Sequence, residues 1–293
     1  MLITETGSLV TVRAKEHSDL LATAYSNQVV VVKGNSKVVD RFVGALVNCL
    51  EWNHEGLIGV GGEDGTVKVV SSNGDSVAEG KGHVGAVLAC DWDVTGRLLV
   101  TGGLDECLCL WEPRASNNPI ATIAAHSDPI LSVSFNGDGY KLASASVDGL
   151  IRVWDVRASL KRCLATIIDD DNPVVSSVMW SPNDQYLVSA SMDNAVRLWD
   201  YETKRCVRTY KGPKFGRIGR ARLGRMGELG YVIAAGGEDG LWAWNAQSKN
   251  VVIKPKEDVE KQSVLDFEIT PDQVYYVNGT DGLIHSLAVK SFT

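Results

Sequence analysis

The residues that could take part in chemistry are five histidines, a run of three aspartates and one glycine-rich segment. No histidines have the HExxH spacing or another metal-ligand spacing. The aspartates at 169–171 are consecutive, whereas a calcium loop alternates its ligands. Segment 59–65, GVGGEDG, departs from G-x-G-x-x-G and precedes a strand pattern, so a hairpin explains it better than a phosphate loop. We therefore expect no catalytic residue, no metal site and no cofactor.

One basic cluster stands out in the sequence GRIGRARLGR. It contains Arg217, Arg220, Arg222 and Arg225, interleaved with glycine. Such a cluster could bind phosphates or an acidic partner. The alternative is that these arginines form the exposed face of an irregular strand. The sequence leaves both interpretations open.

Hydroxyl, acidic and tryptophan residues recur at fixed offsets in three segments. In each segment the Asp lies four residues after the Ser or Thr, and the Trp lies six residues after the Asp. Two of the segments also have a preceding histidine, which allows a hydrogen-bonded chain of His, Ser/Thr, Asp and Trp that would tie a loop to two strands. We expect these residues to be structural: His83, Thr101, Asp105 and Trp111; His126, Ser144, Asp148 and Trp154; and Ser189, Asp193 and Trp199.

Acidic turn residues give the period of the repeat. Each lies between two strand-like apolar runs, and they are separated by 41, 43, 45, 46 and 42 residues: Asp64, Asp105, Asp148, Asp193, Asp239 and Asp281. A further pair of runs, LLATAY and VVVVKG, precedes the first of them. Units of about 40–45 residues with four strands each are typical of WD-repeat β-propellers. The sequence thus predicts an all-β, seven-bladed propeller that spans residues 1–293 as a single domain.

The last repeat lacks an outer strand, because too few residues follow LIHSLAV. We expect the N-terminal segment Leu2–Thr6 to supply this strand and so close the ring. The middle repeats are the most regular. In the second, sixth and seventh repeats Val60, Ala235 and Val277 stand where the hydroxyl residue is expected, and Trp244 comes one residue early.

Bulk composition restricts the other classes of function. The net charge of −7 argues against a protein whose whole surface binds nucleic acid. No stretch approaches the 18 apolar residues of a membrane helix, and the first residues lack the pattern of a secretory signal. We expect no membrane association.

The region from Ala125 to Tyr210 resembles a known family. Its segments AHSDPILSVSFNGDG, VDGLIRVWD, IDDDNPVVSSVMWSPNDQYLVSASMDNAVRLWDY and KRCVRTY are similar to the WD-repeat subunit of COMPASS and MLL-type histone H3 lysine-4 methyltransferase complexes. The resemblance implies a non-catalytic nuclear scaffold that binds a SET-domain methyltransferase subunit and a second WD-repeat subunit, and not a homo-oligomer. The alternative is a WD-repeat adaptor of another assembly, such as a ubiquitin-ligase receptor or an RNA-processing scaffold.

The resemblance also implies two partner sites. In the family, one face takes an arginine from the methyltransferase or a histone tail between two aromatic rings. Leu88 and Ala221 stand at the ring positions here, Val147 replaces a pocket tyrosine, and Glu63 matches the pocket acid. Without stacking, we expect at most weak binding of a histone tail or nucleosome.

The second implied site lies on the opposite face. In the family this face receives an acidic and hydrophobic segment of the second WD-repeat subunit. The matching positions are Asn183, Tyr186 and Leu198. Ordinary turn formation and strand packing would also explain these three residues.

Overall fold

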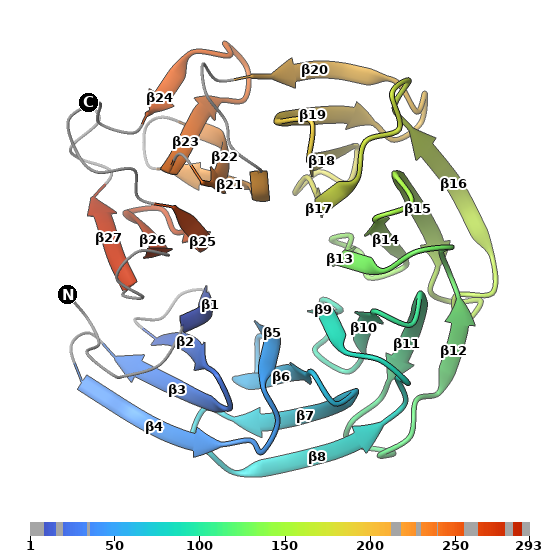
Figure 1. Ribbon diagram of the computed structural model, residues 1–293, viewed down its shortest axis with the longest axis vertical. Helices are drawn as coiled ribbons and strands as arrows, with labels where there is room; N and C mark the ends of the chain where they lie inside the picture. The colour runs from blue at the N-terminus through green and yellow to red at the C-terminus, as the bar shows by residue number, and fades with distance from the viewer. Residues whose placement is uncertain are drawn as a thin grey trace.

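The computed structural model is a closed ring of seven antiparallel sheets around a central channel (Figure 1). It describes residues 9–15, 20–33, 36–211, 218–226, 230–238, 240–254, 263–278 and 284–288. These residues contain strands and turns but no helix. The prediction of an all-β, seven-bladed propeller is therefore confirmed.

Each blade is a meander whose first strand lines the channel and whose last strand lies at the rim (Figure 1). The first three blades contain β1 (Leu9–Ala14), β2 (Leu20–Tyr25), β3 (Gln28–Lys33) and β4 (Ser36–Phe42); β5 (Val47–Trp52), β6 (Leu57–Gly62), β7 (Thr66–Ser71) and β8 (Ser76–Lys81); and β9 (Val87–Trp92), β10 (Leu99–Gly103), β11 (Cys107–Trp111) and β12 (Ala121–Ala124).

The fourth, fifth and sixth blades contain β13 (Ile130–Phe135), β14 (Lys141–Ser146), β15 (Leu150–Asp155) and β16 (Cys163–Ile168); β17 (Val175–Trp180), β18 (Tyr186–Ser191), β19 (Ala195–Asp200) and β20 (Cys206–Tyr210); and β21 (Ile218–Met226), β22 (Gly230–Gly237), β23 (Gly240–Asn245) and β24 (Val251–Ile253). The seventh contains β25 (Val264–Ile269), β26 (Gln273–Asn278) and β27 (Ile284–Ala288).

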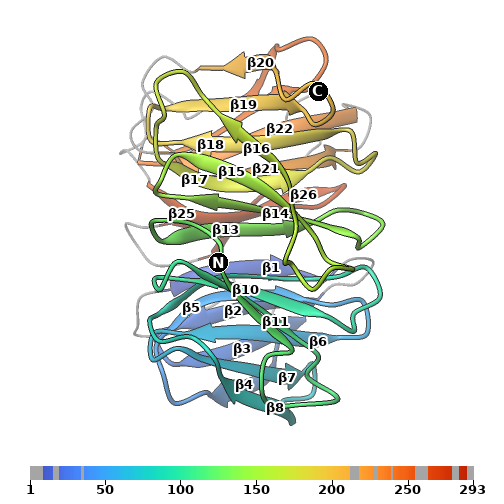
Figure 2. The same ribbon diagram turned by 90° about the vertical axis from the view of Figure 1, so that its right-hand side faces the viewer.

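The turns between strands lie on two opposite faces of the ring, as the edge-on view in Figure 2 shows. Because each sheet is a meander, every first strand starts on one face and ends on the other. A β-bulge follows the first residue of each of these seven strands, at Val10, Asn48, Leu88, Leu131, Ser176, Gly219 and Leu265. A bulge increases local twist and redirects side chains. We call the face nearest these residues the bulge face and the other the channel-end face.

The hydrophobic core lies between the blades. Buried apolar side chains form seven clusters in the described chain, one between each pair of neighbouring sheets. The cluster between the last and first sheets joins Val277 and Ile284 to Val12, Val30 and Val32. Packing thus closes the ring at this junction. The predicted closing strand Leu2–Thr6 lies outside the described residues.

The repeated polar residues form chains of hydrogen bonds in the third and fourth blades. His83 Nδ1 lies 2.9 Å from Asp105 Oδ1, and its Nε2 lies 2.7 Å from Thr101 Oγ1. Trp111 Nε1 donates to the same hydroxyl at 2.8 Å. A neutral histidine with its proton on Nδ1 satisfies every member, since the hydroxyl then donates to Nε2.

The fourth blade repeats this arrangement. His126 bridges Asp148 and Ser144 at 2.9 and 2.7 Å, and Trp154 Nε1 donates to Ser144 Oγ at 2.9 Å. Burial lowers the pKa of His126 and outweighs the opposing effect of its bond to Asp148. The imidazole is therefore kept neutral, as the hydrogen-bonded chain requires.

The fifth blade uses an arginine in place of the histidine. Trp199 Nε1 donates to Ser189 Oγ at 2.9 Å, as in the other blades. Asp193, however, pairs with Arg197 at 2.5 Å, and Arg197 also contacts Asp169 at 2.6 Å. The acidic run at 169–171 is thus partly anchored, a role that its composition alone did not reveal.

Trp244 occupies the same register as the other repeated tryptophans. It lies opposite Ile233, just as Trp111 lies opposite Leu99. The expectation that Trp244 comes one residue early is correct for the sequence spacing but not for its position in the sheet. A turn that is one residue shorter accounts for the difference.

Loss of a hydroxyl should lower the free energy of unfolding more where a histidine also bonds to that hydroxyl. Ser144→Ala leaves Trp154 Nε1 and His126 Nε2 without a partner, so we expect a loss of about 2–4 kcal/mol in the free energy of unfolding. Ser189→Ala removes only the partner of Trp199 and should cost about 1–2 kcal/mol. Urea denaturation of the two variants measures the difference. Equal losses would show that the histidine adds no stability to the hydrogen-bonded chain of residues.

Candidate functional site

The central channel holds a cavity of about 680 Å³ that is lined by the first strands of the blades. Its wall includes residues from all seven of these strands: β1, β5, β9, β13, β17, β21 and, through Glu268, β25. Residues of the channel-end turns, among them Asn53, His54 and Pro182, also line it. The cavity therefore lies towards the channel-end face.

Polar side chains bridge neighbouring inner strands around this wall. Tryptophan side chains act between the first three blades: Trp52 Nε1 donates to Arg13 O, and Trp92 Nε1 donates to Glu51 O. Between the third and fourth blades, Asp91 accepts the N–H of Phe135 at 2.7 Å.

Serine hydroxyls continue the bridging on the opposite side of the channel. Ser132 accepts from Val178 N and donates to Val178 O, at 3.1 and 3.2 Å. Ser177 donates to Ala221 O at 3.2 Å. These bonds join the fourth, fifth and sixth blades without any net charge.

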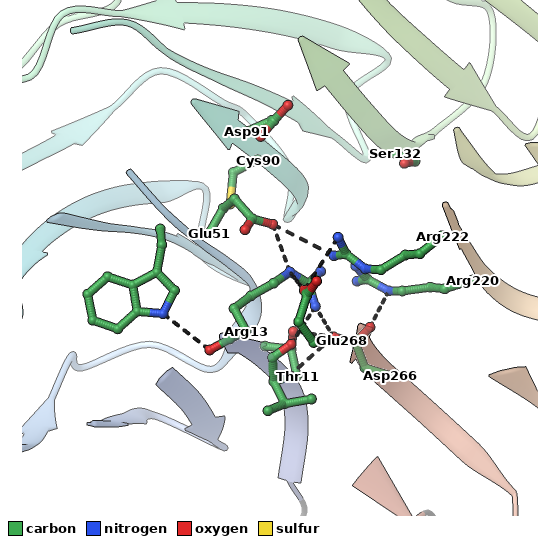
Figure 3. Close-up of polar contacts among 12 residues, drawn as sticks. Thr11, Arg13, Glu51, Cys90, Asp91, Ser132, Arg220, Arg222, Asp266 and Glu268 are labelled. Carbon is green, nitrogen blue, oxygen red and sulfur yellow. Dashed lines mark hydrogen bonds and ion pairs between the residues drawn. The ribbon is translucent and has the colours of Figure 1, made fainter. Parts of the chain in front are cut away.

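Where the sixth, seventh, first and second blades meet, ion pairs bridge the inner strands (Figure 3). Arg13 is central to them and is only 3% exposed. Its Nε lies 2.7 Å from Glu51 Oε2, and its Nη1 lies 2.5 Å from Asp266 Oδ2. Asp266 also accepts the hydroxyl of Thr11 at 2.5 Å. One side chain of the first blade thus links the second blade to the seventh.

Burial and charge set the protonation of these carboxylates. Burial alone would raise the pKa of Asp266, but the charges of Arg13, Arg220 and Arg222 outweigh it and hold that pKa far below its usual range. Glu268 has the opposite balance, since burial raises its pKa more than the arginines lower it.

Asp91 lies on the other side of the cavity, and Figure 3 shows no arginine paired with it. Burial, together with the charge of Glu51, raises its pKa to about 7. Backbone N–H groups of Phe135 and Trp92 donate to its two oxygens at 2.7 and 2.9 Å. This carboxyl therefore changes charge near neutral pH while keeping a structural role.

The four arginines of the basic cluster do not share one environment. Arg220 and Arg222 line the cavity and have side chains that are 29% and 17% exposed. Arg225 is exposed on the same strand and does not line the cavity. Arg217 lies outside the described residues. Neither sequence interpretation anticipated that two of these arginines point into the channel, because spacing alone does not show where the channel lies.

The residues expected at the arginine pocket lie near the bulge face. Glu63 is exposed at the β6–β7 turn, Leu88 is the bulge residue of β9, and Val147 is half-buried at the β14–β15 turn. Ala221 is 1% exposed, packs between the fifth and sixth blades and also lines the channel cavity. The position that corresponds to Leu88 in the sixth blade is Gly219, two residues earlier.

The three residues expected at the other partner site lie in the fifth blade. Asn183 is exposed, and its amide bonds Ser181 and Gln185 within the turn. Tyr186 is half-buried at the start of β18. Leu198 packs against the cluster between the fifth and sixth blades. Asn183 and Tyr186 lie towards the channel-end face, and Leu198 lies on the side of the blade.

The described part of the chain contains no group of three or more His, Cys, Asp or Glu residues placed to hold a metal ion. It also contains no helix that is long and apolar enough to span a bilayer.

Removing the central arginine should destabilise the ring strongly. Arg13→Ala leaves the buried Asp266 and the half-buried Glu51 without their nearest cation, and loss of one partner of a buried ion pair typically costs about 3–5 kcal/mol in the free energy of unfolding. Arg97→Ala is the control, because Arg97 forms an exposed pair with Glu112 and its loss should have little effect. Chemical denaturation of both variants tests this, and a similar effect of the two changes would contradict it.

The depressed pKa of Asp266 gives a second test of the same cluster. Its contribution to stability should be fully present above the ordinary aspartate pKa, about 4, and should be lost as the pH falls through its lower folded value. Asp266→Asn should therefore reduce the acid dependence of unfolding below about pH 4. Unfolding curves at several pH values measure the slope, and an unchanged slope would contradict the assignment.

Comparisons with known proteins agree with the ring architecture. The WD domain, G-beta repeat, matches residues 74–112, 117–155 and 161–200. COMPASS component SWD3 of Saccharomyces cerevisiae is 30% identical over 217 residues, which cover 69% of this chain and 68% of that protein. Anaphase-promoting complex subunit cdc20 of Dictyostelium discoideum is 25% identical over 46% of this chain, and the ribosome biogenesis protein WDR12 homolog of Nematostella vectensis is 34% identical over 36%. These two matches cover only 27% and 24% of the relatives. The chain belongs to the WD-repeat β-propeller family.

Proposed function

We propose that this protein is a non-catalytic scaffold subunit of a COMPASS-like histone H3 lysine-4 methyltransferase complex in the nucleus. The observation that carries the proposal is the similarity to COMPASS component SWD3, which covers more than two thirds of both chains. The resemblance of residues 125–210 to the WD-repeat subunit of such complexes agrees with it. The other relatives are similar over much shorter stretches.

The ring supplies what a scaffold needs. Seven sheets packed against one another by buried apolar clusters form a rigid body, and its turns offer separate surfaces on two faces. A catalytic subunit and a second WD-repeat subunit can then be held at the same time on different surfaces. We propose these two proteins as partners.

We propose a reduced arginine pocket on the bulge face. A guanidinium that entered near Glu63 would meet Leu88 and Gly219 at the bulge positions, neither of which has an aromatic ring. Loss of stacking typically costs about 0.5–2 kcal/mol for each ring. We therefore propose that binding of the catalytic subunit depends on contacts beyond this pocket, and that a histone tail or nucleosome alone binds weakly.

The channel-end face of the fifth blade is the proposed site of the second WD-repeat subunit. Tyr186 provides a half-buried ring beside the exposed turn of Asn183. Val207 on the outer strand of the same blade is 49% exposed and adds apolar surface near the rim. Leu198 supports the blade from its packed side.

Purification of a tagged copy with its companions tests the function as a whole. Recovery of a SET-domain methyltransferase and a second WD-repeat protein supports the proposal. The relatives named for the anaphase-promoting complex and for ribosome biogenesis define the alternative, an adaptor of another assembly. Recovery of a ubiquitin ligase or an RNA-processing complex instead would replace the proposal with that function.

Truncation of the half-buried ring of Tyr186 in the fifth blade should weaken one interaction selectively. Tyr186→Ala is expected to reduce affinity for the second WD-repeat subunit by about 1–3 kcal/mol, as for a modest hot spot. Tyr140→Ala is the control, because Tyr140 is 51% exposed in the neighbouring blade and contacts Arg157. Titration calorimetry with the purified partner compares the two, and equal affinities would remove Tyr186 from the interface.

A further inference from the structure

Two arginines of β21 project side by side into the channel cavity (Figure 3). Arg220 and Arg222 are two residues apart on a strand, so their side chains point to the same side. Ala221 between them packs towards the fifth blade instead. The strand therefore presents two guanidinium groups to one enclosed space.

These guanidinium groups have unused hydrogen-bonding capacity. Arg220 Nε lies 3.4 Å from Asp266 Oδ1, and Arg222 lies 3.5 Å from Glu268 and 3.8 Å from Glu51. These contacts are longer than an ordinary charge-assisted hydrogen bond, which is about 2.7–2.9 Å. Arg222 Nε is buried without a hydrogen-bond partner in the described chain. Each guanidinium carries five N–H donors, so most of the donors have no close acceptor there.

One oxygen of the carboxylate nearest to Arg220 is already bound by other groups. Asp266 Oδ2 accepts from Thr11, from the N–H of Val12 and from Arg13, at 2.5, 3.3 and 2.5 Å. The other oxygen, Oδ1, lies 3.4 Å from Arg220 Nε and has no hydrogen-bond partner in the described chain. The charge of Asp266 is thus shared among three arginines, Arg13, Arg220 and Arg222.

We propose that the channel cavity binds an oxyanion, a carboxylate or phosphate group, held between Arg220 and Arg222. Planar guanidinium groups bind such groups in a bidentate manner. The cavity of about 680 Å³ has the size of a small-molecule site. The bound group would belong to a free anion or to an acidic side chain inserted from the channel-end face.

The site is separate from the expected arginine pocket in both place and charge. The cavity wall does not include Glu63 or Leu88. The carboxylate on its far side, Asp91, has a pKa of about 7 and so gives up its charge easily near neutral pH. An anion in the cavity would therefore meet little fixed repulsion from that side.

Titration calorimetry on the isolated protein tests the site. The probes are inorganic phosphate, pyrophosphate, citrate and a blocked peptide rich in aspartate and glutamate. We expect at least one probe to bind, with affinity about tenfold lower in Arg222→Gln and in Arg220→Gln. Arg225→Gln is the matched control, since Arg225 lies exposed on the same strand, and its affinity should stay within about twofold of the original.

The choice of probe identifies the source of the anion. Binding of phosphate, pyrophosphate or citrate indicates a free anion, and binding of the peptide alone indicates an acidic segment of a partner. Circular dichroism shows whether each variant is folded. If Arg222→Gln does not fold, Arg222→Lys replaces it in the test, because lysine keeps the positive charge. Failure of every probe, or equal affinity in the folded cavity variants and the control, would overturn the proposal. The test needs no partner protein, so its outcome is independent of the proposed scaffold function.

Discussion

The buried pairing of Arg13 with Glu51 and Asp266 is the interaction on which closure of the described ring depends most directly. A propeller has to join its last blade to its first, and here one side chain contacts both the second and the seventh blades. Charges of this kind are costly to bury and repay the cost only when they are well paired. Thr11 and the backbone of Val12 complete the pairing at Asp266, while apolar packing between β1, β3, β26 and β27 covers the same junction.

The two halves of the ring are held together in different ways. In the third, fourth and fifth blades, Trp, Ser or Thr, and Asp join strands within each sheet, helped by His or Arg197. The second, sixth and seventh blades lack the hydroxyl residue, and there the ion pairs of the channel wall cross from sheet to sheet. Divergence of the outer repeats has therefore not left these blades without polar support. In these blades this polar support lies in the channel wall and not within the sheets.

This division separates surfaces that are free for partners from those that hold the ring. The exposed turns of both faces can change sequence without disturbing the inner strands, which suits a scaffold. The residues of the channel wall cannot change in this way, because their charged groups bridge neighbouring blades. Arg220 and Arg222 contribute to this bridging through longer contacts, of 3.4–3.8 Å, and also line the cavity.

The sequence by itself determined the class of fold, the number of blades and the hydrogen-bonded chains, because these follow from local spacing: Asp105 and Trp111 keep their offset wherever the blade lies. It also placed Asn183 in its turn. Only the tertiary structure decided what meets in the channel. Arg13, Glu51, Arg222 and Asp266 come from four blades, and no local pattern links residues up to 253 positions apart.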